Sequence, residues 1–110
     1  MHAKKIALLA RQAAEDKQAE EVVVMDVGKL TSLAHYFLVM HGNSDRHVRA
    51  IAQNVIDFLQ SHKLKCWHKE GLDSGQWVLL DYGPVIIHIF FKEIREFYNL
   101  ERLWGDAPKL

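Results

Sequence analysis

Hydrophobic residues near the N-terminus recur at the spacing of an amphipathic helix. They are Ile6, Leu9, Ala10 and Ala13. This i, i+3, i+4, i+7 pattern predicts a helix over residues 4–16. A polar stretch follows, and then a short β-branched run at 22–25 that predicts a buried strand. After a turn-like segment, residues 35–40 predict a second strand.

The clearest local signal is the run Gly42-Asn43-Ser44-Asp45. Gly and Asn end the preceding strand, Ser44 is a favourable N-cap, and Asp45 complements the helix dipole in the first turn. The apolar stripe that follows predicts a helix ending near His62; its members are Val48, Ile51, Ala52, Val55, Ile56 and Leu59.

The C-terminal half predicts three more strands and a last helix. The strands are expected at 65–69, 76–82 and 85–91, and the last two form a hairpin around Gly83-Pro84. A helix over 92–103 follows, with a short docking tail at 103–110. The resulting order, α-β-β-α-β-β-β-α, predicts one α/β domain spanning 1–110, with a mixed sheet of about five strands flanked by helices.

Composition narrows the class of function. The 110 residues carry 14 Lys and Arg against 14 Asp and Glu, so the net charge is zero and a bulk polyanion binder is not expected. The longest stretches without charge are too short for a membrane span, which needs about 20 apolar residues. A single cysteine, Cys66, cannot form an internal disulfide. These features predict a cytoplasmic protein without a membrane segment.

Seven histidines raise the question of a metal site. The nearest group in sequence is His62, Cys66 and His68, but no paired ligand motif accompanies it, so scattered histidines are the favoured interpretation. No nucleophile motif surrounds any serine or Cys66. We therefore expect no metal, no cofactor and no catalytic residue, and keep a small metal- or RNA-binding module as an alternative.

Strand alternation draws attention to the last hairpin. Trp77, Leu79 and Asp81 share one face of their strand, a mixture typical of a protein-binding patch, although Trp77 could equally belong to the core. His88 lies inside an apolar strand and needs a partner, whether Asp81, a backbone carbonyl or another molecule.

Several segments, in order along nearly the whole chain, resemble the ribosomal silencing factor family (RsfS, also called Iojap-like). The matching segments are Asp26-Val27, His41-Gly42-Asn43-Ser44-Asp45-Arg46-His47-Val48, Glu70-Gly71, Trp77-Val78-Leu79-Leu80-Asp81-Tyr82-Gly83, Val85-Ile86-Ile87-His88-Ile89-Phe90, Arg95, Tyr98-Asn99-Leu100-Glu101 and Leu103-Trp104. Two positions depart from the family pattern: His35 stands where an acidic residue is usual, and Pro84 stands where Asp is common.

The resemblance implies a non-enzymatic translation factor. Such a factor binds the large ribosomal subunit through its protein L-fourteen, blocks association with the small subunit when nutrients are short, and forms a homodimer when free. The implied fold is related to nucleotidyltransferases. An enzyme of that kind is the competing hypothesis, but it needs paired carboxylates on the strand after the helix, and residues 65–69 supply none.

We therefore predict a partner-binding surface for L-fourteen, with a possible minor contact to rRNA. The residues expected to form it are Trp77, Leu79, Asp81, Tyr82 and His88 from the hairpin, with Ser44, Arg46, His47 and Arg49 from the start of the second long helix.

Overall fold

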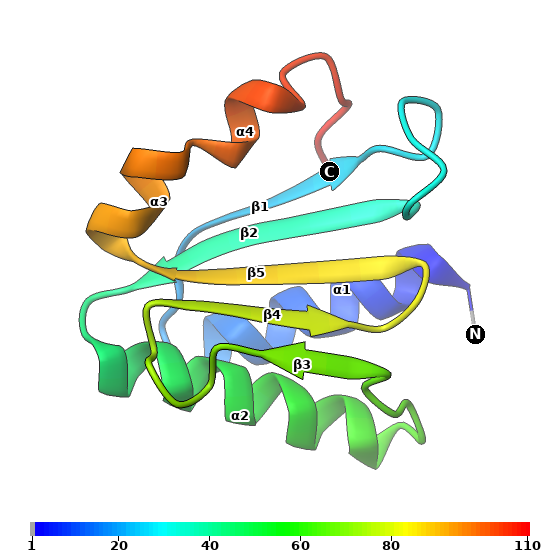
Figure 1. Cartoon of the computed structure of the whole chain (residues 1–110). Coiled ribbons are helices and arrows are strands. Elements are labelled where there is room, and N and C mark those ends of the chain that lie inside the picture. The colour runs from blue at the N-terminus through cyan, green and yellow to red at the C-terminus, as the bar shows by residue number, and fades with distance from the viewer. Residues whose placement is uncertain (1) are drawn as a thin grey trace.

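The computed structural model describes residues 2–110 and contains four helices and five strands (Figure 1). The helices are α1 (Ala3–Asp16), α2 (Asp45–Ser61), α3 (Lys92–Tyr98) and α4 (Leu100–Leu103). The strands are β1 (Glu20–Asp26), β2 (Tyr36–Gly42), β3 (His68–Glu70), β4 (Trp77–Asp81) and β5 (Val85–Phe91). The predicted element order is thus confirmed, apart from a division of the last helix.

The five strands form one mixed sheet in the order β1-β2-β5-β4-β3. β2 and β5 are parallel neighbours at the centre, and every other pair is antiparallel. The chain leaves β2 through α2 and then forms β3 and β4 at the edge before β5 returns beside β2. The expectation of a mixed five-stranded sheet flanked by helices is confirmed.

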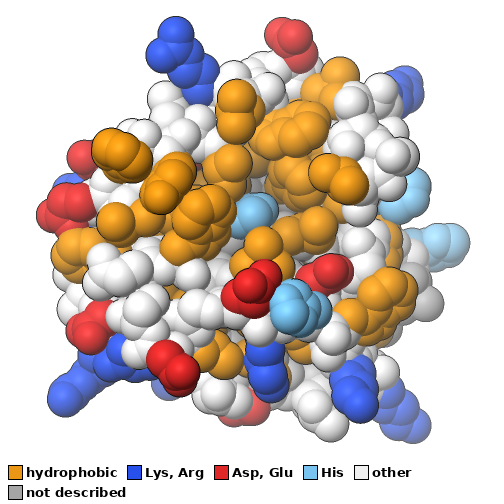
Figure 2. Space-filling view, viewed as in Figure 1, with side chains coloured by type: hydrophobic (Ala, Val, Ile, Leu, Met, Phe, Trp, Pro, Cys, Tyr) orange, Lys and Arg blue, Asp and Glu red, His pale blue; other side chains and the backbone are white. Residues whose placement is uncertain are grey.

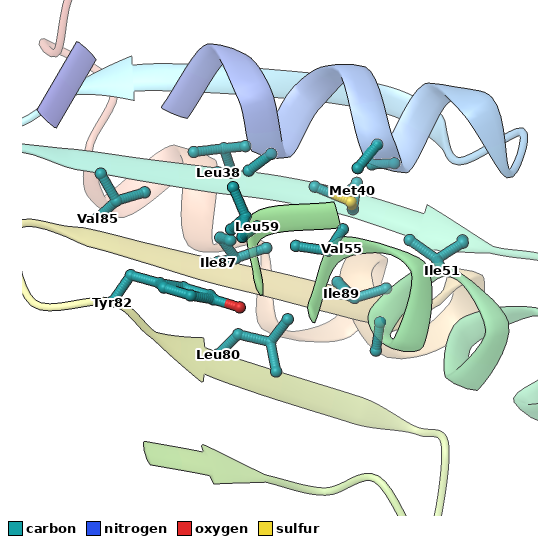
Figure 3. Packing of buried hydrophobic residues seen from close by; sticks show 14 of the residues in the cluster. Leu38, Met40, Ile51, Val55, Leu59, Leu80, Tyr82, Val85, Ile87 and Ile89 are labelled. Atoms are coloured by element: carbon teal, nitrogen blue, oxygen red, sulfur yellow. The ribbon is translucent and has the colours of Figure 1, made fainter. Parts of the chain in front are cut away.

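The first face of the sheet is covered by α1 and α2 (Figures 1 and 3). Alternate residues of the strands meet the apolar stripe of α2, which includes Ile51, Val55 and Leu59. α1 contributes alanines at this interface, so its backbone lies close to α2. Ser44 caps α2 as predicted, because its hydroxyl accepts a hydrogen bond from the His47 backbone N–H at 3.0 Å.

The second face is covered over β1, β2 and part of β5 by α3, α4 and the C-terminal segment. Trp104 packs edge-to-face on Phe37, with ring centroids 5.2 Å apart, and Ala107 is buried. The last residues run along the free edge of β1, where the Asp26 N–H donates to the Pro108 carbonyl at 2.7 Å. The predicted tail therefore docks on its own domain, while Leu103 remains exposed.

Two predicted elements differ from the structure. The helix expected over 92–103 is interrupted at Asn99, which adopts the left-handed conformation with φ of 47°. Asparagine tolerates that conformation better than most residues, so the chain turns there and α4 begins in a new direction. The third strand, expected at 65–69, is shifted to His68–Glu70.

A buried arginine joins α3 to α4 and to the sheet. Arg95 forms two hydrogen bonds to the Glu101 carboxylate, at 3.1 and 3.0 Å. Its remaining terminal nitrogen donates to His41 Nδ1 at 2.9 Å and to the Glu20 carbonyl at 3.3 Å. The guanidinium thus links one short helix to the other and both of them to β1 and β2. We call Arg95, Glu101, His41 and Glu20 the Arg95 clamp.

The clamp predicts a large stability loss on replacement of Arg95 by methionine. Arg95→Met leaves the Glu101 carboxylate and His41 without their donor. Removal of one member of a fully buried ion pair costs about 3–5 kcal/mol, and partial exposure of Glu101 places the expected loss at the lower end of that range. Arg102→Met is the matched control, because Arg102 is exposed on the neighbouring helix and its loss should cost less than about 0.5 kcal/mol. Urea unfolding of both variants measures the difference, and equal losses would contradict the clamp.

Two buried histidines lie on the second face of the sheet, His41 in β2 and His88 in β5. Burial, with a further contribution from the Arg95 charge, lowers the pKa of His41. Burial alone lowers the pKa of His88 from 6.5 to about 4. His88 is therefore held neutral in the folded protein above about pH 4, and His41 protonates less readily than a free imidazole.

This neutrality predicts a loss of stability in mild acid. Between pH 6.5 and about 4 the unfolded chain protonates His88 and the folded chain does not, so the free energy of unfolding falls as pH falls. A shift of this size corresponds to about 3 kcal/mol. Urea unfolding at several pH values gives the slope of the unfolding free energy against pH. This slope should be smaller for His88→Phe than for the wild type. His2→Phe, at an exposed position, should keep the wild-type slope; if His88→Phe keeps it too, His88 is not the source.

Candidate functional site

The helices leave part of the second sheet face uncovered, beside β4 and β3. We call this surface the open face; its residues are Trp77 and Leu79 of β4, Glu70 of β3, and Ile86 and His88 of β5. The side chains share one face because they occupy alternate or directly paired positions of antiparallel strands. Figure 2, which has the view of Figure 1, shows hydrophobic side chains gathered around a histidine on this side of the molecule.

Trp77 is held on the open face by three neighbours. Its ring lies 4.9 Å from the ring of Phe90 and 4.8 Å from that of Tyr98 on α3. Its indole N–H donates to Nδ1 of His88 at 3.2 Å. Trp77 is half-buried by these contacts. One part of its ring packs against the core, and the rest is exposed to solvent on the open face. This position combines the two roles that the sequence left open.

A groove of about 390 Å³ runs beside Trp77, lined by Glu70, Gly71, Trp77 and Leu79. Gly71 is required at its end, because φ is +84° and a Cβ atom would lie 1.9 Å from the Trp77 carbonyl oxygen. The apolar surface continues onto α3, where Phe97 contacts Tyr98 edge-to-face at 5.1 Å and is 79% exposed. An uncovered aromatic surface beside a groove is typical of a protein-binding site.

The structure brings together only part of the predicted hairpin set. Trp77, Leu79 and His88 lie on the open face. Asp81 is at its margin, where its carboxylate accepts a hydrogen bond from the Gly83 N–H at 2.7 Å. Tyr82 does not fit the prediction: it is 4% exposed and belongs to the core beneath α1 and α2 (Figure 3). The alternation that places Asp81 on one face turns the next residue to the other.

The four residues predicted from the start of α2 lie in the other layer, away from the open face. Ser44 is occupied as the N-cap. His47 joins two turns, because its Nδ1 accepts from the Asn43 N–H at 3.0 Å and its Nε2 contacts the Lys17 carbonyl at 2.8 Å. Arg49 lies 3.4 Å from Asp45 and donates to the Asp73 carbonyl at 3.3 Å. Arg46 is exposed, and its side chain makes no hydrogen bond or ion pair within residues 2–110. Its guanidinium is therefore available to another molecule.

Sequence reasoning missed the aromatic pair Phe97-Tyr98. Both were counted among the hydrophobic positions that define the last helix, and neither was proposed as a binding residue. The available signal was their adjacency: neighbouring residues on a helix point about 100° apart, so two consecutive large rings spread over a wide part of the surface of a short helix.

The potential metal-ligating side chains lie apart in the part of the chain that the structure describes. Within residues 2–110 no three His, Cys, Asp or Glu side chains come close enough together to hold a metal ion. β3, the strand after α2, carries a single carboxylate, Glu70, which pairs with His68 at 3.1 Å. No helix in the described range is long and apolar enough to cross a membrane. The arrangement is suited to binding through an apolar surface.

Comparison with known proteins gives a consistent result. A family model described as ribosomal silencing factor during starvation (RsfS) matches residues 1–110. The chain is 44% identical over 108 residues to ribosomal silencing factor RsfS of Bacillus subtilis. This alignment covers 98% of this chain and 92% of that protein. A more distant relative, mouse mitochondrial assembly of ribosomal large subunit protein 1, is 31% identical over 93 residues, or 80% of this chain and 40% of that protein.

Solved structures agree with the sequence comparison. A crystal structure of a protein from Chromobacterium violaceum superposes with a TM-score of 0.93 at 37% identity, covering 96% of this chain and 88% of that one. A second crystal structure, of a protein from Bacillus halodurans, superposes with a TM-score of 0.86 at 36% identity. The match covers 97% of each chain. The family match extends over all the elements that form the open face and the Arg95 clamp, and the chain belongs to the RsfS family of ribosomal silencing factors.

Proposed function

We propose that this protein binds the large ribosomal subunit through protein L-fourteen, uses the open face to do so, and thereby blocks association with the small subunit. Membership of the RsfS family supports a ribosome-associated regulator. The name of the mouse relative also refers to the large subunit. The observation that carries the choice of surface is the uncovered groove beside Trp77 and Leu79.

The proposed mechanism is steric and needs no reaction. Stable protein interfaces bury about 800 Å² on each partner. The molecule measures 34 × 33 × 21 Å, so one broad face can make a contact of that size. The α1–α2 layer would then stand on the subunit as an obstacle about as thick as the domain. A protein that occupies this surface of the large subunit represses translation under nutrient limitation, because the small subunit cannot join.

Three further features belong to the same proposal. The protein acts in the cytoplasm, where bacterial subunits join. The free chain is a homodimer, which its exposed Phe97 and Leu103 favour because a second copy can cover them. Arg46, exposed at the start of α2 and without a side-chain bond within residues 2–110, would supply a minor contact to rRNA.

Leu79 gives a cleaner test of the open face than Trp77. Trp77→Ala should weaken binding by more than about 1 kcal/mol if the ring is an anchor, but its contacts with Phe90 and Tyr98 mean that it should also destabilise the fold. Leu79 is half-buried and points into the groove, so a charge there disturbs the surface more than the core.

Leu79→Asp should abolish co-sedimentation with large subunits at micromolar protein, because a carboxylate would be desolvated in the apolar contact. Gln60→Asp introduces the same charge on the exposed side of α2 and should bind as the wild type does. The wild type and Gln60→Asp should also reduce the joining of small subunits added afterwards. If the wild type does not co-sediment, the proposed function is wrong; if Leu79→Asp still binds, the open face is the wrong surface.

A further inference from the structure

His88 occupies the centre of the open face, and its environment determines what it offers to a partner. In the sheet it lies directly between Val39 of β2 and Leu79 of β4. The Phe37 ring contacts it edge-to-face at 5.7 Å, and Trp77 lies on its other side at 6.0 Å. The imidazole is therefore a polar group enclosed by aromatic and aliphatic side chains.

The hydrogen bond from Trp77 fixes which ring nitrogen carries the proton. An indole nitrogen can only donate, so His88 Nδ1, 3.2 Å away, must accept and carries no hydrogen. A neutral imidazole holds its single proton on the other nitrogen in that case. His88 is thus held in the tautomer with hydrogen on Nε2, and a second donor cannot arise at Nδ1 while Trp77 is in place.

The Nε2–H group has no acceptor in the described part of the chain. No hydrogen bond of residues 2–110 involves this atom. It is not among the fully enclosed side-chain atoms that lack a partner, which are Glu20 Oε2 and the Tyr82 hydroxyl. His88 as a whole is 8% exposed, and Nε2 is the ring nitrogen that the Trp77 indole leaves without a partner.

We propose that His88 is a specificity-determining residue of the open face, whose Nε2–H donates a hydrogen bond to an oxygen acceptor, a backbone carbonyl or a carboxylate, presented by the bound protein. This inference rests on the proposed function, because it concerns the surface that docks on the large subunit. Trp77 acts here as a positioning residue, since it holds the tautomer that makes Nε2 the donor.

The selectivity follows from the exclusion of water. Nε2 is not fully enclosed, so water can reach its N–H in the free protein. When a partner covers the surrounding apolar surface, that water leaves, and a donor without an acceptor is costly. A partner surface that presents a lysine, an arginine or an aliphatic group to this position is therefore rejected, while one with an oxygen is accepted. Burial keeps the ring neutral by lowering the pKa of His88 to about 4, so it offers a single donor and no charge at neutral pH.

Two substitutions separate the donor from the shape of the ring. His88→Phe keeps an aromatic ring and loses the N–H. Affinity for purified large subunits should fall roughly tenfold or more, because the oxygen acceptor of the partner is then buried without a donor. His88→Gln retains an amide N–H at a similar distance from the backbone and should recover most of the affinity. Thermal melting of both variants, compared with the wild type, shows whether the fold is retained.

The outcomes also distinguish this inference from the proposed function. Binding by His88→Phe as tight as the wild type, while Leu79→Asp fails to bind, overturns the donor role and leaves the function standing. A wild type that does not bind overturns both. If His88→Phe does not fold, His88→Gln still decides: a loss of affinity as large as that of Leu79→Asp contradicts the inference.

Nitrogen NMR tests the tautomer in the free chain, and the response of the Nε2–H proton to a partner is a readout that a purely structural histidine would not give. The ¹⁵N shifts of His88 should show a protonated Nε2 and an unprotonated Nδ1. Trp77→Phe keeps a ring but removes the indole donor, so it should yield a mixture of tautomers. Addition of isolated protein L-fourteen to the wild type should shift the Nε2–H proton downfield. A free chain protonated on Nδ1, or a resonance that L-fourteen leaves unchanged, overturns the proposal.

Discussion

The buried guanidinium of Arg95 decides how the C-terminal third of the chain covers the sheet. Its bonds to Glu101, His41 and the Glu20 carbonyl hold α3 and α4 over β1 and β2. A buried cation is tolerated only when its hydrogen-bonding groups are satisfied, so this arrangement of two short helices has few alternatives. Neither helix is long enough to be stable alone.

The consequence is a sheet with two unequal faces. The first is closed by two long helices along its length. The second is closed only where α3, α4 and the tail reach, and β4 and β3 remain accessible beside them. Natural proteins seldom leave a groove beside a large aromatic residue uncovered without a use. The central histidine adds a directed polar group to a surface that would otherwise discriminate by shape alone.

Much of this fold could be predicted from the sequence because local signals and packing agree. The apolar stripe of α2, its Ser44 cap and the alternation in β4 were all readable, and the last of these placed Trp77 and Leu79 on one face. Tyr82 was predicted in the partner-binding surface because it follows Asp81 in sequence, but the alternation of side chains along the strand turns it into the core.

Other features depend on contacts between distant parts of the chain and could not be read locally. The partner of His88 is the Trp77 indole, which was not among the three partners considered, because the pairing depends on the register of β4 against β5. The break at Asn99 arises from a backbone conformation that many asparagines do not adopt. Arg95 matched the family pattern, yet its bonds to β1 and β2 join residues far apart in sequence. The α2 residues looked exposed and polar, but loops that fold back onto them engage His47 and Arg49.

The central claim is that the large subunit covers the open face and, apart from the minor contact proposed for Arg46, leaves the α1–α2 layer free. Hydroxyl-radical footprinting of the chain, alone and bound to purified large subunits, tests it at single side chains. We expect strong protection of Trp77 and Leu79 on binding, with Phe58 and Ile56 of α2 labelled equally in both states. Protection of the α2 residues with unchanged labelling of Trp77 would contradict the account, because the molecule would then bind through its opposite side.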